Sequence, residues 1–335
     1  MGDDRLLSVR DLKVTFMSRH GTALAVKGVD FDLSRGKVLA IVGESGCGKS
    51  ATAMSLMHLL PSRSARIEGR MLLRGVDIGA LAEREMNDVR GKQMAMIFQE
   101  PMTSLNPLLT IGYQLSEPIR YHLGLDRAAT RQRAIELLDL VGIPAASQVM
   151  RSYPHQLSGG MRQRVMIAMA LSCDPDILIA DEPTTALDVT IQAQIIDLLR
   201  RIQRRTGMSV IIITHDLGVV SEFADEVIVM YAGRVVESGP VDEVLEDPRH
   251  PYTSGLLSSI PDIDNDRERL RTIPGNVPNP RTLMAGCWFH PRCARKTEQC
   301  ELAVPALAAI DVAGRRQVAC FHPIHDFPVR DLRNG

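Results

Sequence analysis

The chain has almost no excess of charge and no long apolar run, and each absence argues against a class of protein. Its 39 basic and 40 acidic residues leave a formal net charge of −1 at pH 7. Binding nucleic acid through its phosphates requires a basic face, so the composition gives no support for nucleic acid as a partner. The longest apolar run, Val165–Leu171, is far shorter than the roughly 20 residues that a membrane-spanning helix needs. We therefore expect any contact with a membrane to be made through partners.

The sequence also shows no internal repeat or low-complexity tract. It begins with MGDDRLLSVRDLKVTF, which is acidic at its start and has no long apolar core, so we expect no secretory signal. What is present is the balance of a globular protein, with 45% apolar and 24% charged residues among 335. A chain of this length holds one large domain or about two ordinary ones, and it can bury a core without disulfides.

Short apolar strands alternate with helices through most of the chain. The runs typical of strands include KVLAIV, QMAMIFQ, DILIAD, SVIIIT and EVIVMYA, and such uninterrupted strands indicate a parallel sheet covered on both faces. Before them, residues 6–16 and 24–33 are predicted strands, and residues 49–60 a helix that Pro61 closes. The mainly helical segment 111–173 predicts an inserted subdomain. After residue 260 the chain is rich in Pro, Asn and charge, which indicates a linker before a compact tail.

The segment GESGCGKS, Gly43–Ser50, matches the pattern G-x(4)-G-K-[ST], with a strand before it and a helix after it. The glycines let backbone N–H groups turn toward phosphate oxygens, Lys49 neutralises the β- and γ-phosphates, and the Ser50 hydroxyl can bind Mg²⁺. A glycine-rich turn with a chance lysine is the alternative, which the flanking strand and helix disfavour. The segment therefore predicts a nucleotide-binding loop.

Further candidate residues lie at two strand ends and one helix start. DILIADEP places Asp181 at the end of a buried strand, where it can bind Mg²⁺, and Glu182 can accept the proton of an attacking water. His215 ends another strand, and open α/β sheets bind ligands beyond the carboxyl ends of their strands. In LSGGM, Ser158 can cap a helix whose free N–H groups form a second anion site. Taken singly, a solvated acidic turn, a structural histidine and an ordinary capped helix are the alternatives.

In this order and spacing, the motifs resemble those of ABC-type ATPase subunits over roughly residues 5–260. Walker A is GESGCGKS, the Q-loop glutamine is Gln99, the signature is LSGGM, Walker B is ILIADE, the D-loop is Ala186–Asp188 and the switch histidine is His215. The signature ends in Met161, where the family usually has glutamine, and this change leaves the helix-end N–H donors in place.

The resemblance implies an α/β fold, namely a P-loop NTPase of ABC type. Its parts are a mostly parallel core sheet, an N-terminal antiparallel β subdomain and a helical subdomain at about residues 100–173. A small cysteine-containing C-terminal extension would occupy residues 261–335, after the nucleotide-binding domain of residues 5–260.

The resemblance also implies roles for individual residues. Glu182, Gln99 and His215 would be catalytic, and Ser50, Gln99 and Asp181 would hold Mg²⁺. In this family the loop of one subunit holds ATP and the signature of another covers its γ-phosphate. The contacts implied to act in trans are Ser158, Gly159, Gly160 and Asp188. The residues implied to bind ATP are Phe16, which would stack on adenine or else belong to the core, and Gly43, Glu44, Ser45, Gly46, Cys47, Gly48, Lys49, Ser50 and Ala51.

The branch is indicated by EPMTSLNPLLTIG, YPHQLSGGM and HPYTSGLL, which resemble D-type subunits of dipeptide and oligopeptide importers. That branch implies an ATPase using ATP and Mg²⁺ at the cytoplasmic face of the inner membrane. Its implied partners are a second ATPase subunit, F-type rather than an identical copy, two permease subunits and an extracytoplasmic solute-binding protein. Nickel or other small-solute importers of the same branch are an alternative, and a soluble ABC protein of DNA repair or translation is another. Co-purification with two membrane subunits would favour an importer.

Four of the six cysteines lie in the tail, which resembles the C-terminal extension of peptide-importer ATPases, some of which hold a [4Fe–4S] cluster. They are Cys287, Cys293, Cys300 and Cys320. Four thiolates can hold a [4Fe–4S] cluster or zinc, and in a reducing compartment disulfides are disfavoured. The spacing is neither that of common zinc modules nor that of ferredoxins, so cluster, plain thiols and zinc stay open. Cys47 and Cys173 are expected to be non-ligands.

Overall fold

The computed structural model describes residues 4–19, 21–100, 104–185, 188–259, 272–279, 281–282 and 284–325. The chain divides into two compact units. The first unit comprises Met1–Gly79 and Thr214–Gly335, and the second comprises Ala80–Ile213. The 3₁₀ helix η1, Ile78–Ala80, spans the sequence boundary between them. Most of the predicted linker after residue 260 lies outside the described residues.

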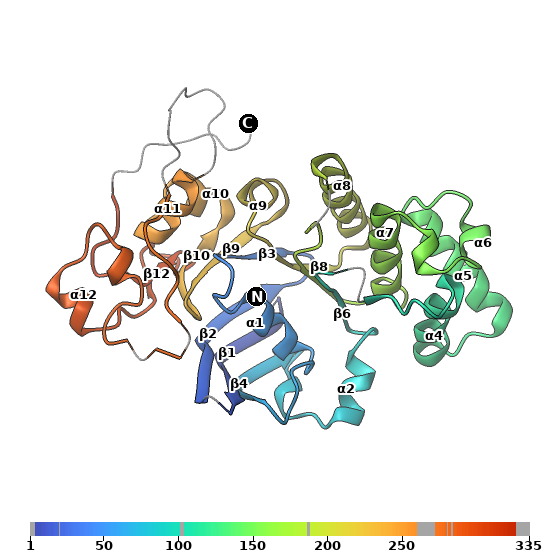
Figure 1. Cartoon of the computed structure of the whole chain (residues 1–335), viewed down its shortest axis with the longest axis horizontal. Coiled ribbons are helices and arrows are strands. Elements are labelled where there is room, and N and C mark those ends of the chain that lie inside the picture. Colours follow the sequence, from blue (N-terminus) through green and yellow to red (C-terminus); the bar gives the residue numbers. More distant parts are fainter. Residues whose placement is uncertain are drawn as a thin grey trace. The chain divides into compact units, whose positions relative to one another are not determined.

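The first unit begins with an antiparallel sheet in the order β2-β1-β4-β5, seen in blue and cyan in Figure 1. Its strands are β1 (Arg5–Ser18), β2 (Gly21–Ser34), β4 (Ala65–Leu73) and β5 (Val76–Asp77). Leu7 pairs with Leu33 and Val9 with Phe31, and all four side chains are buried because alternate residues of a strand face the same side. This sheet is the antiparallel β subdomain that the resemblance implied.

The core strands of the first unit follow the order β3-β9-β10-β12-β11. The strands are β3 (Val38–Val42), β9 (Glu226–Tyr231), β10 (Arg234–Pro240), β12 (Gln317–Val318) and β11 (Ala308–Ala309). β3 and β9 pair in parallel, whereas β10 and the two strands of the C-terminal extension continue antiparallel. Every residue of β3 is buried, as its uninterrupted apolar sequence predicts. The helices of this unit are α1 (Lys49–Leu56), α9 (Leu217–Phe223), α10 (Val241–Glu246), α11 (Pro251–Ser258), η3 (His290–Arg292) and α12 (Glu298–Leu302).

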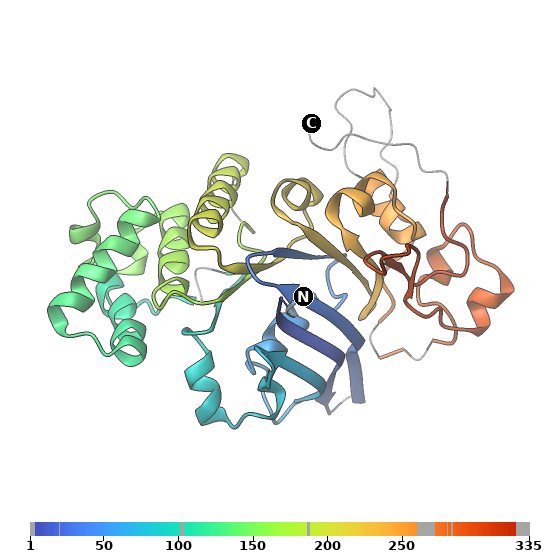
Figure 2. The same cartoon turned by 180° about the vertical axis from the view of Figure 1, so that it is seen from behind.

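The second unit contains parallel strands in the order β8-β7-β6 and a group of packed helices. The strands are β6 (Met94–Ile97), β7 (Ile177–Asp181) and β8 (Ser209–Ile213). The helices are α2 (Glu83–Val89), α4 (Ile111–Leu123), α5 (Arg127–Leu140), α6 (Ala146–Val149), η2 (Pro154–Gln156), α7 (Gly159–Ala170) and α8 (Val189–Thr206). Figures 1 and 2 show α4, α5 and α7 gathered side by side, which is the predicted helical subdomain. The α/β fold class with parallel core strands is thereby confirmed.

Helix ends follow the capping chemistry of the sequence. Thr110, Asp126 and Ser158 cap α4, α5 and α7 with their side chains, as short polar residues commonly do. The helix predicted to reach Pro61 ends earlier, at Leu56, because His58 takes a left-handed backbone with φ of 50°. Among the described residues, none of the helices is both long and apolar enough to cross a membrane.

A buried ion pair fixes the C-terminal extension to β10. The Glu237 carboxylate is 0% exposed and accepts hydrogen bonds from the backbone N–H groups of Arg249 (2.8 Å) and His250 (2.9 Å). Arg316, in the extension, places its Nη2 at 3.3 Å from Glu237 Oε1. Burial raises the pKa of Glu237, and these hydrogen bonds oppose that rise. Removing one partner of such a buried pair costs about 3–5 kcal/mol, so the extension and β10 depend on each other.

Candidate functional site

The phosphate loop of the first unit fits its surroundings because Gly43 and Gly48, two of its three glycines, have no side chain there. Gly43 has φ of 149° and Gly48 has φ of 103°. A Cβ on Gly43 would lie 2.2 Å from the Met230 carbonyl oxygen, and one on Gly48 would lie 2.6 Å from the Ala25 carbonyl oxygen. Only glycine tolerates both the left-handed backbone and this close approach. The loop therefore passes directly against β2 and β9 before α1 begins.

The lysine of the loop is turned inward. Lys49 is 5% exposed, and its Nζ donates to the carbonyl oxygens of Gly43 (2.8 Å) and Glu44 (3.2 Å). Ser45 and Gly46 are exposed at the tip of the loop. The lysine ammonium is thereby held against the backbone of the loop, where it can neutralise a bound phosphate.

Cys47 lies within the loop but points away from solvent. Its side chain is 0% exposed, and its carbonyl oxygen accepts the Gly233 N–H at 2.9 Å. Burial raises the pKa of the Cys47 thiol, which disfavours the reactive thiolate. Cys47 thus packs inside the unit with its side chain and holds the loop through its backbone carbonyl. Ser50 and Ala51, in the first turn of α1, are half-buried.

Phe16 and His215 complete the predicted residues of the first unit. Phe16 lies on β1 between Ala23 and Ala65 and is partly exposed, unlike the fully buried Val14 two residues earlier. This placement favours a stacking surface over a core phenylalanine. His215 is exposed and follows Thr214, whose N–H donates to the Ile41 carbonyl of β3 at 3.3 Å.

In the second unit, the structure brings Gln99 and Glu182 together. The Gln99 Nε2 donates to Glu182 Oε2 at 3.0 Å, and the Thr185 hydroxyl donates to the same oxygen at 2.8 Å. Glu182 has a left-handed backbone with φ of 45°, and its N–H donates to Ile213 of β8 at 2.9 Å. A strained non-glycine backbone commonly marks a functional position. Asp181, the last residue of β7, is only 4% exposed.

The signature segment begins α7 at the surface of the second unit. Ser158 and Gly159 are exposed, and Ser158 Oγ accepts the Met161 N–H at 3.3 Å. Leu157 is buried beside this cap. The helix start therefore lies at the surface, where the first N–H groups of a helix can bind an anion, and the Met161 N–H is used by the Ser158 cap.

Two contacts tie α7 to the segments around it, and no sequence pattern indicates the first of them. Gln163 is 1% exposed, and its Nε2 donates to the Pro183 carbonyl at 2.5 Å, just after Glu182. A Cβ on Gly160 would meet Ile191 at 3.2 Å, so α7 packs closely on α8. Asp188 caps α8 by accepting the Ile191 N–H at 2.9 Å. Ala186 and Leu187 of the D-loop lie outside the described residues.

The four thiols of the C-terminal extension line one small cavity. The residues around it include Cys287, Cys293, Cys300 and Cys320. Burial, helped by the neighbouring thiols, raises the pKa of Cys287, Cys293 and Cys320, the last to about 11. Within the described part of the chain, no group of three or more His, Cys, Asp or Glu side chains is placed so that it could hold a metal ion.

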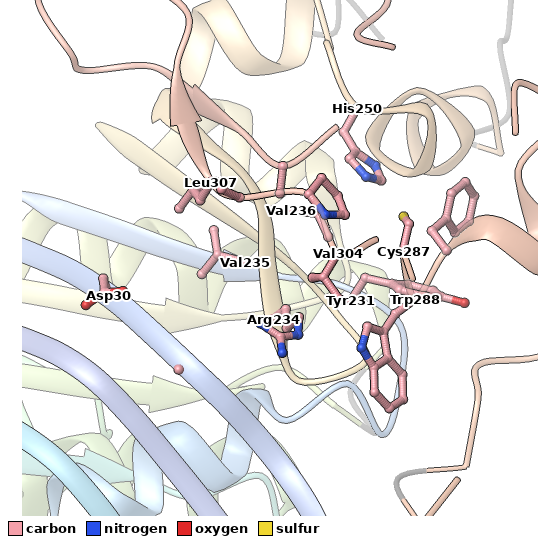
Figure 3. Close-up of a pocket in the computed structure, with 15 residues that line it drawn as sticks. Asp30, Tyr231, Arg234, Val235, Val236, His250, Cys287, Trp288, Val304 and Leu307 are labelled. Atoms are coloured by element: carbon pink, nitrogen blue, oxygen red, sulfur yellow. The ribbon is translucent and has the colours of Figure 1, made fainter. Parts of the chain in front are cut away.

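A second cavity, of about 330 Å³, lies between β10 and the extension (Figure 3). His250 lines it, and burial lowers the pKa of His250 to about 3, so the ring is neutral and its Nδ1 accepts the Tyr252 N–H at 3.0 Å. Trp288 lines it too and carries the Lys27 Nζ at 3.9 Å from its ring centre. Burial, with the nearby Arg234, lowers the pKa of Lys27 to about 8. The Lys27–Trp288 contact thus joins β2 to the extension.

Comparisons with known proteins agree with this geometry. Residues 26–185 match the family described as ABC transporter, and residues 236–300 match the oligopeptide/dipeptide transporter, C-terminal region. The chain is 51% identical over 317 residues to the oligopeptide transport ATP-binding protein AppD of Bacillus subtilis (strain 168), covering 94% of this chain and 96% of AppD. It is 51% identical over 323 residues to a putative peptide import ATP-binding protein of Brucella melitensis biotype 1, with coverages of 93% and 96%.

Two solved structures share the fold. One is the dimeric ATP-binding cassette MJ0796 bound to ADP and Pi, with 28% identity, a TM-score of 0.63 and coverage of 70% of this chain and 98% of that one. The other is cbiO1 from Clostridium perfringens, part of the ABC transporter complex cbiONQ, with 31% identity, a TM-score of 0.60 and coverages of 72% and 91%. The chain therefore belongs to the family of ABC transporter ATP-binding proteins. Within that family it carries the C-terminal region of oligopeptide/dipeptide transporters.

The close approach at Gly48 yields a prediction. We expect Gly48→Ala to weaken ATP binding about tenfold or more, because the new Cβ would displace the loop from the Ala25 carbonyl. Gly75→Ala is the matched control, since Gly75 has φ of 81° but nothing within 4 Å of an added Cβ. Equilibrium ATP titration of the three proteins decides it, and equal affinities would show that the fit of the loop does not depend on Gly48.

Proposed function

We propose that this protein is the ATP-hydrolysing subunit of an importer of dipeptides or oligopeptides. Membership of the ABC transporter family supports ATP hydrolysis, and the Bacillus and Brucella relatives are described as oligopeptide transport and peptide import proteins. The single observation that carries the peptide assignment is the match of residues 236–300 to the oligopeptide/dipeptide transporter region. A nickel importer of the same branch is a second candidate, but neither of these relatives is described in that way.

The proposed chemistry starts at the phosphate loop. Lys49 would exchange its bonds to the Gly43 and Glu44 carbonyls for bonds to the β- and γ-phosphates. Ser50, Gln99 and Asp181 would hold Mg²⁺, which neutralises charge on the transferring phosphoryl group. Phe16 would stack on the adenine.

Glu182 is the proposed general base. Its Oε2 already accepts two hydrogen bonds, from Gln99 and Thr185, which fix the carboxylate in one orientation. A carboxylate held in this way can align a water and accept its proton as the water attacks the γ-phosphorus. His215 would contact the γ-phosphate.

The signature is proposed to act on another subunit. Ser158 and Gly159 at the start of α7 are exposed, and MJ0796, which shares the fold, is described as dimeric with ADP and Pi. Ser158–Gly160 of one subunit would therefore cover the nucleotide of its partner, with Asp188 beside it. That partner would be an F-type ATPase subunit. Two permeases and an extracytoplasmic binding protein would complete an assembly at the cytoplasmic face of the inner membrane.

The cysteine cavity supports one further part of the proposal, a [4Fe–4S] cluster. Four thiols line one cavity, and four is the number of cysteine ligands that a [4Fe–4S] cluster takes. We expect anaerobically purified protein to be brown and to contain about four iron atoms per chain. Cys320→Ser should lower the iron content, and Cys173→Ser should not. A colourless, iron-free preparation would mean that the four cysteines are plain thiols.

Removing the proposed base tests the ATPase. We expect Glu182→Gln to retain ATP binding but to hydrolyse ATP at least about 100-fold more slowly. The amide keeps the hydrogen bonds to Gln99 and Thr185 but accepts no proton. The variant should accumulate as an ATP-bound dimer in gel filtration and should abolish uptake of a labelled dipeptide by cells. Glu222→Gln, on the exposed face of α9, is the control. Normal turnover of Glu182→Gln would assign the base elsewhere, and retained dipeptide uptake would exclude dipeptides as the cargo.

The signature is tested by blocking its surface. We expect Ser158→Arg to abolish hydrolysis by the assembled complex while the separate chain still binds ATP, because the added side chain would occupy the space of the partner's phosphate. Asp126→Arg removes the cap of another exposed helix of the same subdomain and should leave hydrolysis near its normal rate. If the Ser158→Arg complex remains active, ATP is not bound between two subunits.

A further inference from the structure

A bidentate ion pair joins the C-terminal extension to the phosphate loop across 248 residues of sequence. Arg292 Nη1 lies 2.6 Å from Glu44 Oε2, and Arg292 Nη2 lies 3.0 Å from Glu44 Oε1. The arginine side chain is 5% exposed and the glutamate side chain 29%. Glu44 is the second residue of the phosphate loop, so the extension reaches into the motif that defines the nucleotide site.

The other hydrogen-bond donors of Arg292 are also occupied. Nε donates to the Pro274 carbonyl at 2.8 Å, Nη2 also donates to the Ile273 carbonyl at 3.4 Å, and Nη1 also lies 3.4 Å from the Tyr231 hydroxyl. A guanidinium has five N–H donors in a fixed fork, and each of the five has a partner here. The hydrogen bonds to Glu44 are the main cause that raises the pKa of Arg292. A lysine could reproduce the charge but not this set of contacts.

The backbone of Glu44 is held from the same side. Its N–H donates to the Tyr252 hydroxyl at 2.8 Å, and Tyr252, on α11, is 0% exposed. The Tyr252 ring lies 4.6 Å from the ring of Tyr231 and 5.5 Å from that of Phe289, between centroids. Three aromatic rings, from β9, α11 and the extension, thus pack together around Tyr252, which binds the Glu44 N–H.

Glu44 also contacts the lysine of the loop through its backbone carbonyl. Lys49 Nζ donates to the Gly43 and Glu44 carbonyls, so the residue that Arg292 holds by its side chain also takes part in placing the lysine. Loops that are fixed before a ligand arrives lose less entropy on binding. We infer that Arg292 is a positioning residue that holds the phosphate loop in its ATP-binding shape, with Tyr252 as its support. The C-terminal extension then supports the nucleotide site through Arg292.

This inference rests on the proposed ATPase function, and the test separates the two. The full-length variants are Arg292→Gln, Arg292→Lys, Glu44→Gln and the double variant Arg292→Gln/Glu44→Gln. The matched control is Lys296→Gln, which breaks the exposed Lys296–Glu301 pair of the same extension (2.9 Å). Equilibrium ATP affinity is measured together with KM and kcat for hydrolysis, and thermal unfolding reports the stability of each protein.

We expect Arg292→Gln to weaken ATP affinity and to raise KM for ATP about tenfold, as loss of a charge-assisted pair implies, with a smaller effect on kcat. Glu44→Gln should act in the same direction, and the double variant should be little worse than either single variant, because both remove one interaction. Arg292→Lys should recover only part of the affinity, and Lys296→Gln should match the wild type.

The results that overturn the inference are distinct from those that overturn the ATPase function. Wild-type ATP affinity in a folded Arg292→Gln protein, or fully additive effects in the double variant, would make the pair a structural contact only. If Arg292→Gln does not fold, Glu44→Gln tests the same ion pair without altering the extension. Should the wild type bind ATP but not hydrolyse it, the proposed function fails while the affinities still decide the role of Arg292.

Discussion

The structure depends on how closely the phosphate loop passes over the backbone beneath it. The carbonyl oxygens of Ala25 and Met230 lie so close to Gly48 and Gly43 that neither position has room for a Cβ atom. This contact between main chains fixes the loop against strands of both sheets of the first unit, and it leaves the inner face of the loop to Lys49. A nucleotide site in this chain is therefore a property of backbone shape first and of side-chain chemistry second.

The phosphate loop is also supported by residues that lie outside the nucleotide-binding motif. Glu44 is gripped at its carboxylate by Arg292 and at its N–H by the Tyr252 hydroxyl. The extension in turn is fixed to β10 by the buried Glu237–Arg316 pair. The C-terminal region is therefore not an appendage, because the same unit of structure holds its cysteine cavity, its aromatic rings and the first residues of the phosphate loop.

Features that depend on neighbouring residues could be predicted from the sequence, whereas contacts between distant segments could not. The phosphate loop, the Ser158 cap and the strand ending in Asp181 were all predictable because glycine, capping residues and apolar runs act over a few neighbouring residues. The predicted end of α1 was wrong, because the left-handed backbone at His58 ends the helix before Pro61. The contacts of Gln163 with Pro183 and of Arg292 with Glu44 were missed because each joins segments far apart in sequence. No periodicity or motif indicates such pairs, and their residues are ordinary in their own local patterns.

The grip of Arg292 on Glu44 has a thermodynamic corollary. If the extension strengthens ATP binding, bound ATP stabilises the extension by the same coupling free energy, because linkage between two sites is reciprocal. Arg292 is followed directly by Cys293, whose thiol lines the cysteine cavity. Filling the phosphate loop should therefore slow the exchange of backbone amides around that cavity. A measurement on the C-terminal extension would then report whether ATP is bound at the phosphate loop.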